Sequence, residues 1–272
     1  MRPTNPNAKL EHAQAAATRV VDVHKRLVDF LRPGVTLAQI DTFVGQVLDD
    51  LGAKSCFKGY KVPRCPAFPS FSCLSPNDCI VHGTAGFRRE PLVEGDTISI
   101  DIGVKYHGWI GDAAWTYYMG SMSDDQKRLC AAGRESIDAG IAQLVPGKTY
   151  TEFARAVQDV VETRHGLHCV RGLGGHGYSQ RLHEPPFIAN SLPSFPGEWP
   201  DAHTKVKTGT LLAVEPMIAV GTPEISQEPG TWPIYTADGS LSVHYEHDVY
   251  IGEDGPVVLT EELAQLPDVV GD

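Results

Sequence analysis

The chain has 272 residues, of which 42% are hydrophobic and 21% charged, a composition typical of a globular protein. It carries 23 Lys and Arg against 34 Asp and Glu, a formal net charge of −11, and no block of basic residues occurs. This balance argues against nucleic acid or an acidic membrane as the main partner. Neither an apolar leader nor a long uncharged apolar stretch is visible, so we expect a cytoplasmic protein that does not enter the membrane.

Six cysteines are present, but none forms a Cys-x-x-Cys pair. This spacing argues against a zinc ribbon and against a thioredoxin-like redox motif. Without an export signal a disulfide framework is not expected either, so we expect reduced thiols in the core or in a pocket. The six are Cys56, Cys65, Cys73, Cys79, Cys130 and Cys169.

The chain contains an internal repeat, offset by 113 residues from Pro33 to Pro146. Residues 31–40 (LRPGVTLAQI) align with residues 144–153 (LVPGKTYTEF). Upstream of each Pro-Gly we expect an amphipathic helix, over about residues 9–31 and 124–144. Thr36 and Thr149 are placed to cap the helix that follows in each copy.

Strand-like segments complete each half, at residues 97–104, 210–219 and 241–251. We therefore expect an α+β fold whose two halves, about residues 9–120 and 121–252, are related by a pseudo-twofold axis. Residues 9–272 would form a single catalytic domain after an N-terminal tail of residues 1–8. A site between the halves is a natural place for chemistry.

Two aspartates lie in the first expected strand pair. The isoleucines of residues 98–102 mark the buried face, and Asp101 lies on the other face. If the chain turns about residues 106 and 107, Asp112 falls directly opposite Asp101, and like charges there would need a cation or a proton between them. A shifted register, in which each aspartate caps a turn, explains the two residues equally well.

Two glutamates interrupt later strands. Glu215 lies in an apolar run, where a bare carboxylate would be costly. Glu246 shares one side of its strand with His244 and Asp248, and a solvated edge strand would explain that side as well as a metal site would.

His176 lies in the glycine-rich residues 172–177, where the backbone can bring a ligand into a tight site. The same residues match G-x-G-x-x-G, but Pro185 and Pro186 exclude the long helix that a dinucleotide site needs. The prolines also exclude a helical H-E-x-x-H zinc site at His183. No G-x-S-x-G nucleophile motif occurs.

Four carboxylates and one histidine form an oxygen-rich ligand set, which suits Mn, Fe(II) or Co better than a closed structural zinc. Four carboxylates also carry more negative charge than one divalent ion needs. Two ions that share bridging carboxylates would balance this charge and hold a hydroxide between them. The residue types therefore indicate metal-assisted hydrolysis. The set is Asp101, Asp112, His176, Glu215 and Glu246.

Six ordered motifs resemble those of the type I methionine aminopeptidases, over about residues 9–260. They are residues 77–83 (NDCIVHG), 95–101 (GDTISID), 111–112 (GD), 175–177 (GHG) with 183–185 (HEP), 214–217 (VEPM) and 240–247 (SLSVHYEH). The resemblance implies the pita-bread fold, in which two pseudo-twofold halves pack helices on a curved antiparallel sheet. It also implies the removal of the N-terminal methionine from nascent proteins.

The same resemblance implies a role for each residue of the set. The five ligands would hold two divalent ions, Co, Mn, Fe(II) or Zn, with Asp112 and Glu246 bridging them. Glu215 would also take the proton from the metal-bound water. His183 would stabilise the tetrahedral intermediate, and His82 would contact the scissile peptide from the other side.

The resemblance further implies an apolar methionine pocket, although each of its residues would serve equally well in a core. Its expected lining is Cys56, Tyr60, Phe68, Cys73 and Trp232, with His82 and His183 also touching substrate. Asn77 and Ser242 match positions that hold a monovalent cation in relatives.

The chain departs from the family pattern around this pocket. Residues 178–181 (YSQR) replace a small glycine-rich stretch, and Leu182 replaces the aromatic residue common before the second histidine. Extra residues at about 61–66 and a proline-rich loop at 191–200 are expected to rim the cleft and restrict substrates.

Two alternatives stay open. One is an Xaa-Pro aminopeptidase or dipeptidase of the same fold, although those relatives carry a substantial N-terminal domain for which 272 residues leave no room. The other is a pita-bread protein that binds partners without catalysis. For the enzyme we expect a monomer that acts on the N-terminal peptide of nascent proteins, near the ribosome but without direct binding to nucleic acid.

Overall fold

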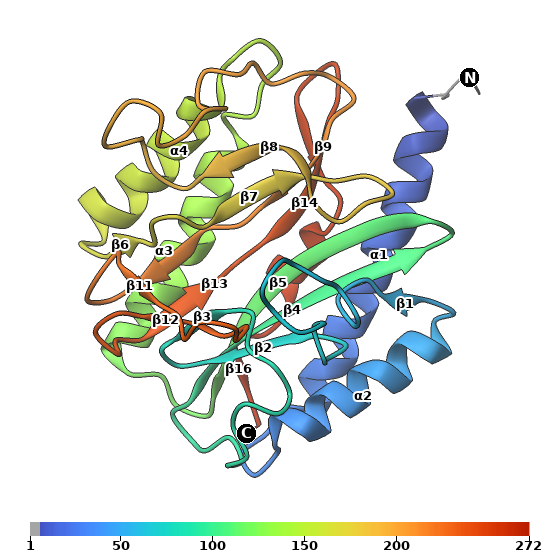
Figure 1. Ribbon diagram of the computed structural model, residues 1–272, viewed down its shortest axis with the longest axis vertical. Helices are drawn as coiled ribbons and strands as arrows, with labels where there is room; N and C mark the ends of the chain where they lie inside the picture. The colour runs from blue at the N-terminus through green and yellow to red at the C-terminus, as the bar shows by residue number, and fades with distance from the viewer. Residues whose placement is uncertain (1–5, 272) are drawn as a thin grey trace.

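The computed structural model describes residues 6–271, with side chains from Leu10 onward. Helices flank strands that meet at the centre of the molecule (Figure 1). The helices are α1 (Pro6–Phe30), α2 (Leu37–Asp50), α3 (Asp124–Ile141) and α4 (Tyr150–Gln158), followed by a π-helical turn (Asp159–Arg164) and later a 3₁₀ turn (Glu261–Gln265). The strands before α3 are β1 (Lys54–Ser55), β2 (Cys73–Pro76), β3 (Cys79–Val81), β4 (Thr97–Tyr106) and β5 (Trp109–Met119). Those after α4 are β6 (His168–Cys169), β7 (Gly174–Gly177), β8 (Glu184–Ala189), β9 (Leu211–Val214), β10 (Met217–Ala219), β11 (Ile225–Ser226), β12 (Ile234–Thr236), β13 (Ser242–His244), β14 (His247–Ile251), β15 (Pro256–Val258) and β16 (Val269–Val270).

The internal repeat appears in the helices at the offset read from the sequence. Helix α2 begins at Leu37 and α4 at Tyr150, which are 113 residues apart. Thr36 caps α2 as expected, because its side chain accepts a backbone N–H in a capping box. Thr149 precedes α4 but makes no such bond, since its hydroxyl is paired with that of Thr151 at 2.6 Å.

The first helix begins earlier than the sequence analysis expects. Helix α1 starts at Pro6, so residues 6–8 of the expected tail are helical, while residues 1–5 lie outside the described part of the chain. Proline is well tolerated at a first helical turn, because the N–H that it lacks would have no partner there. None of the helices between residues 6 and 271 is long and apolar enough to cross a membrane.

The sheets are antiparallel apart from the parallel pair of β5 and β16. One sheet has the order β1-β4-β5-β16, with β2 beside β4, and a second has the order β15-β14-β9-β7-β8. Two smaller sheets have the orders β13-β10-β6 and β11-β12-β3. Helix α1 packs on β4 and β5, and α3 packs on β10 and β13 (Figure 1). The expected α+β pita-bread fold is therefore confirmed.

The β4–β5 hairpin has a different register from the expected one. Tyr106 pairs with Trp109, and Asp101 pairs with Ala114 instead of Asp112. The turn lies one residue later, at residues 107 and 108, and both have positive φ (46° and 84°), as a two-residue I′ turn demands. Gly108 adopts this conformation without strain, which places the turn there. The two aspartates consequently lie on one face as diagonal neighbours, and neither caps a turn.

Two expected strands are each broken in the middle. Residues 210–219 form β9 and β10, and residues 241–251 form β13 and β14. The first break contains Pro216, which has no N–H to continue a ladder. At the second break Glu246 donates its backbone N–H to the carbonyl of Ala114 in β5, at 2.8 Å, so the break joins the two halves. The solvated-edge alternative is wrong, because the Glu246 side of this segment is buried.

Candidate metal centre

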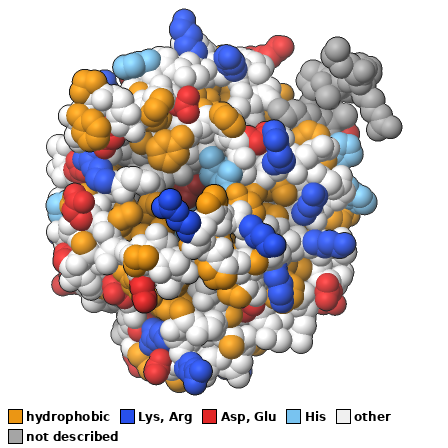
Figure 2. All heavy atoms as spheres, viewed as in Figure 1, with side chains coloured by type: hydrophobic (Ala, Val, Ile, Leu, Met, Phe, Trp, Pro, Cys, Tyr) orange, Lys and Arg blue, Asp and Glu red, His pale blue; other side chains and the backbone are white. Residues whose placement is uncertain are grey.

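Five separate segments bring the predicted ligands to one cleft at the centre of the molecule. Strand β4 supplies Asp101, β5 supplies Asp112 and β7 supplies His176, while the two strand breaks supply Glu215 and Glu246. All five line the same cavity of about 540 Å³. Figure 2 shows a hollow on this face, with histidine at its edge and apolar side chains around it. The sequence-predicted set is thus assembled in space.

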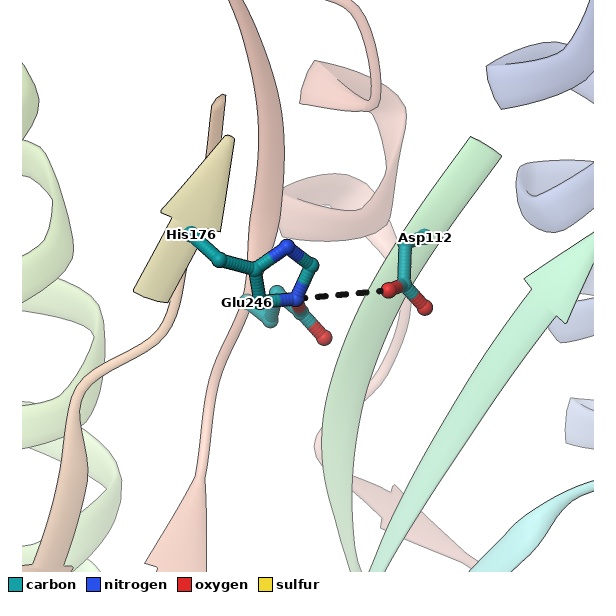
Figure 3. Close-up of side chains that lie close together, drawn as sticks. All are labelled: Asp112, His176 and Glu246. Atoms are coloured by element: carbon teal, nitrogen blue, oxygen red, sulfur yellow. Dashed lines mark ion pairs between the residues drawn. The ribbon is translucent and has the colours of Figure 1, made fainter. Parts of the chain in front are cut away.

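Asp112, His176 and Glu246 form the tightest part of this set. One ligand atom from each lies within 4.8 Å of the others, and the three side chains point toward a common centre (Figure 3). The His176 Nε2 atom lies 3.8 Å from Asp112 Oδ2 and 3.7 Å from Glu215 Oε1. These separations exceed a direct hydrogen bond and are compatible with a cation that the atoms share.

The electrostatics of the cleft disfavour ionised carboxylates in the absence of a cation. Burial raises the pKa of Asp112, Glu215 and Glu246 well above the ordinary range, and repulsion from neighbouring carboxylates raises those of Asp112 and Glu246 further. Burial likewise raises the pKa of Asp101 to about 7. The pKa of His176 is lowered to about 3, again chiefly by burial, so its imidazole is neutral and available as a ligand.

Several buried polar atoms in the cleft or directly behind it have no hydrogen-bond partner within the described part of the chain. Such atoms are costly unless something else satisfies them. They are Asp101 Oδ1, Asp112 Oδ1, Asp248 Oδ1 and His244 Nε2. An oxygen-rich donor set with unsatisfied lone pairs fits divalent cations of the Mn, Fe(II) or Co type. The residues present therefore fit a resident metal group.

Two residues, one lining the cleft and one directly behind it, received no role from the sequence. The His244 side chain is 3% exposed, and its Nε2 lies 3.3 Å from Glu215 Oε2 and 3.9 Å from Glu246 Oε2. Asp248 is fully buried and accepts the backbone N–H of Asp112 at 2.9 Å, which fixes β14 against β5. Strand alternation places His244 and Asp248 on the same side of the segment as Glu246, so the sequence did indicate that both could lie near the metal ligands. It remained ambiguous because a solvated strand face has the same pattern.

His82 and His183 also line the cavity. The His82 ring meets Trp232 edge-on with centroids 6.1 Å apart, and burial lowers its pKa to about 4. The His183 ring lies 4.4 Å from that of His176 at the mouth of the cleft, and partial withdrawal from water lowers its pKa. Both imidazoles are therefore neutral near pH 7 and can each donate one hydrogen bond.

The expected methionine pocket is only partly formed by the residues proposed for it. Tyr60, Phe68, Cys73 and Trp232 line the cavity, but Cys56 does not. The Cys56 side chain packs against Gly103 of β4, because a glycine there leaves room for the sulfur. Phe57, the next residue, lines the cavity instead, together with Leu182, which is buried.

The loop at residues 61–66 contributes to the rim of the cavity through Val62. It is tied down because Trp232 Nε1 donates to the carbonyl of Pro66 at 2.9 Å. In the described structure, residues 191–200 do not themselves line the cavity, and Asp201, which follows them, does. The expectation that both loops rim the cleft is therefore met by residues 61–66 and not by residues 191–200.

Known proteins are similar to this chain over most of its length. Residues 11–253 match the model of metallopeptidase family M24. Methionine aminopeptidase 1 of Mycobacterium tuberculosis is 37% identical over 254 residues, covering 91% of each chain. A crystal structure of methionine aminopeptidase from Thermotoga maritima superposes with a TM-score of 0.84 at 30% identity, covering 96% of this chain and 99% of that one.

A more distant likeness concerns the fold alone. The X-Pro aminopeptidase of Thermotoga maritima has a TM-score of 0.71 at 18% identity, and the match covers 97% of this chain but 62% of that one. The methionine aminopeptidases match in sequence as well as in fold, and along nearly their whole length. The chain therefore belongs to metallopeptidase family M24 and, within it, to the methionine aminopeptidases.

Proposed function

We propose that this protein removes the N-terminal methionine from newly made proteins by hydrolysis, with two divalent metal ions held by the five predicted ligands. The observation that carries the proposal is the convergence of four carboxylates, of which Asp112 and Glu246 are buried, and a neutral histidine in one cavity with apolar walls. The 37% sequence identity to a methionine aminopeptidase supports N-terminal methionine as the residue that is removed.

The ligand charges favour two ions over one. Asp101, Asp112, Glu215 and Glu246 carry four negative charges when ionised, which two divalent ions would balance. Asp112 and Glu246 would bridge the two ions, since both are almost fully buried and both belong to the tightest group of donors. When bound, the metal pair would lower the pKa of a shared water and polarise the scissile carbonyl.

The chain's own groups supply the proton transfers and the substrate contacts. Glu215 accepts a proton from the attacking water at a carboxylate oxygen and delivers it to the leaving amine. His183 donates an N–H to the carbonyl oxygen as negative charge develops there, and His82 contacts the scissile peptide.

The apolar walls of the cavity suit the side chain of the substrate's N-terminal methionine. Phe68 and Trp232 meet edge-on with centroids 5.1 Å apart, and Cys73 lies on β2 beside Asp101 of β4. An unbranched thioether fits such a wall of rings and sulfur, because it is flexible and makes favourable contacts with aromatic edges. The free α-amino group would lie toward the carboxylates, which suits an exopeptidase.

The test is hydrolysis of a Met-Ala-Ser peptide beside an Arg-Pro-Pro peptide by metal-stripped protein, with Mn, Fe(II), Co or Zn added back separately. We expect metal-dependent release of methionine and no cleavage before proline. Cleavage only before proline would assign the protein to the Xaa-Pro peptidases. Hydrolysis of neither peptide with any metal would overturn the proposal and favour a binding protein without catalysis.

Replacing His183 with alanine should separate metal binding from catalysis. We expect His183→Ala to keep its metal content and to lose about 10²- to 10³-fold in kcat, because the missing N–H acts on the developing oxyanion. Metal analysis and steady-state kinetics on the methionyl peptide check this. Loss of metal from this variant would show that His183 belongs to the ligand set instead.

A monovalent cation near Asn77 and Ser242 is also proposed. The Ser242 hydroxyl lies within hydrogen-bond distance of two carbonyl oxygens, to which it can donate: that of Asn77 at 3.1 Å and that of Cys79 at 3.3 Å, so three oxygens lie together here. Neutral oxygens of this kind suit a weakly held monovalent ion. Thermal stability in K⁺ or Na⁺ compared with a bulky organic cation tests the site, and equal stability in all three would argue against it.

We further propose that the enzyme acts as a monomer in the cytoplasm, on the N-terminal peptides of chains that leave the ribosome. Its acidic balance, with 34 Asp and Glu against 23 Lys and Arg, supports activity without direct binding to nucleic acid. Light scattering on the purified protein would contradict the monomer if it gave twice the chain mass.

A further inference from the structure

A tyrosine hydroxyl bonds one nitrogen of the His183 imidazole. The distance from Tyr60 Oη to His183 Nδ1 is 2.7 Å, and the two rings meet nearly edge-on. Within residues 6–271 neither the Tyr60 hydroxyl nor His183 Nε2 has a further hydrogen-bond partner. Nε2 is therefore the ring nitrogen left for a ligand in the cleft.

The backbone around Tyr60 is held firmly. Its N–H donates to the carbonyl of Phe57 and its carbonyl accepts from Phe68, both at 2.8 Å, and Gly59 also bonds Phe68. These bonds close the base of the loop at residues 61–66, and the loop is tied down at its far side by the bond between Trp232 and Pro66. The Tyr60 side chain thus extends from a segment that backbone hydrogen bonds hold in place.

The chemistry of the pair assigns the proton positions. A neutral imidazole has one N–H and one lone pair, so the two nitrogens must play opposite roles. Burial and the nearby Cys56 raise the pKa of Tyr60, so the phenol keeps its proton and can donate it. Donation to Nδ1 satisfies the hydroxyl and leaves the imidazole proton on Nε2. In the reverse arrangement only water, and no other group of the described residues, would accept the Tyr60 proton.

We propose that Tyr60 is a positioning residue for the reaction, which orients His183 and holds it in the tautomer that presents Nε2–H to the substrate carbonyl. The inference rests on the proposed function of His183 but goes beyond a role for Tyr60 as a wall of the methionine pocket. It requires the hydroxyl, whereas a wall requires only the ring.

The decisive variant is Tyr60→Phe, which removes the hydroxyl and keeps the ring. With the metal-loaded enzyme and a methionyl peptide we expect kcat to fall about 10-fold, as for other groups that orient a site residue, while KM and metal content stay within twofold. Tyr106→Phe is the matched control, because Tyr106 also loses one side-chain bond, to Arg19 at 3.2 Å, at the far end of the β4–β5 hairpin.

A double-mutant cycle tests whether the hydroxyl acts through His183. In a His183→Ala background, Tyr60→Phe should cost no further rate, because the group that it orients is gone. A full additional 10-fold loss in that background would overturn the inference. So would a Tyr60→Phe enzyme with unchanged kcat and a raised KM, since that result describes a pocket wall.

A second readout does not depend on activity. It uses ¹⁵N-histidine-labelled, metal-stripped protein, in which the His183 signals are assigned by their loss in His183→Ala. We expect the ¹⁵N chemical shifts to show an unprotonated Nδ1 and a protonated Nε2. Tyr60→Phe should shift the Nδ1 resonance, and Tyr106→Phe should not. A wild-type His183 with its proton on Nδ1 would exclude the inference even if methionine release is normal. Absence of methionine release by the wild type would instead count against the proposed function.

Discussion

Glu246→Ala should abolish metal binding and methionine release together while the protein remains folded. Glu246 is 2% exposed, belongs to the tightest donor group with Asp112 and His176, and is the proposed bridge between the two ions. Loss of a bridging carboxylate removes a ligand from both metals at once. We expect turnover to fall below about 10⁻³ of the wild type, as for removal of groups that hold the reacting centre together.

The fold should survive because this carboxylate does not stabilise the metal-free protein. Burial and repulsion from Asp112 and Glu215 raise the pKa of Glu246, which means that the folded state disfavours its ionised form. Metal content by elemental analysis, turnover and circular dichroism are measured on the same preparations. Asp112→Ala should behave in the same way, and Glu253→Ala, an exposed carboxylate beyond β14, serves as the control.

Full activity in Glu246→Ala or in Asp112→Ala would remove the two-metal proposal. Retention of one metal equivalent with partial turnover would show that one ion suffices and that the bridging assignment is wrong. An unfolded variant would be distinguished by its circular dichroism, and Glu246→Gln, which keeps the side-chain volume, would then replace it.

The stability of the metal-free protein should fall as the pH rises above about 6.5. The folded-state pKa of Asp101 is raised to about 7, and those of Asp112, Glu215 and Glu246 are raised well above their ordinary values, all chiefly by burial. Unfolded carboxyls titrate near pH 4. The folded state therefore binds more protons, and the free energy of unfolding decreases as pH rises from about 4 through the folded pKa values.

Buried histidines have the opposite effect, but at lower pH. The pKa values of His82 and His244 are lowered to about 4 and that of His176 to about 3, in each case chiefly by burial. Their stabilising contribution is present above the unfolded value near 6.5 and is lost as pH falls toward 4. The two effects oppose each other below pH 6.5. Above it the carboxyls lower the stability, and toward pH 8 the buried thiols of Cys56 and Cys73, whose pKa values burial also raises, act in the same direction.

Thermal unfolding of chelator-treated protein from pH 6.5 to 8 checks this prediction. Each carboxyl that stays protonated in the folded state contributes a slope of about 1.4 kcal/mol per pH unit. Saturating Mn or Co should remove the decline, because bound cations favour the ionised carboxylates. Asp112→Ala should show a shallower decline than the wild type when both are metal-free. A flat metal-free profile would contradict the raised pKa values.

Local sequence patterns determined the helices and the ligand residue types. The repeat offset places α2 and α4 correctly, because amphipathic periodicity, Pro-Gly breaks and N-terminal threonines act over a few residues. The motifs that resemble methionine aminopeptidases identified the family. Lone carboxylates in apolar runs pointed to the proposed ligand set, because such groups are costly unless a cation or a partner satisfies them.

Tertiary structure decided the features that depend on how distant segments meet. Positive φ at residues 107 and 108 set the β4–β5 register, so Asp101 and Asp112 are diagonal neighbours and not a directly opposed pair. The backbone bond from Glu246 to Ala114 breaks a segment that reads as one continuous strand. His244 is buried by segments far from it in the chain, and the bond between Tyr60 and His183 likewise joins two distant segments. Alternation along a strand shows which residues share a side, but only packing against another segment determines whether that side faces water or a cleft.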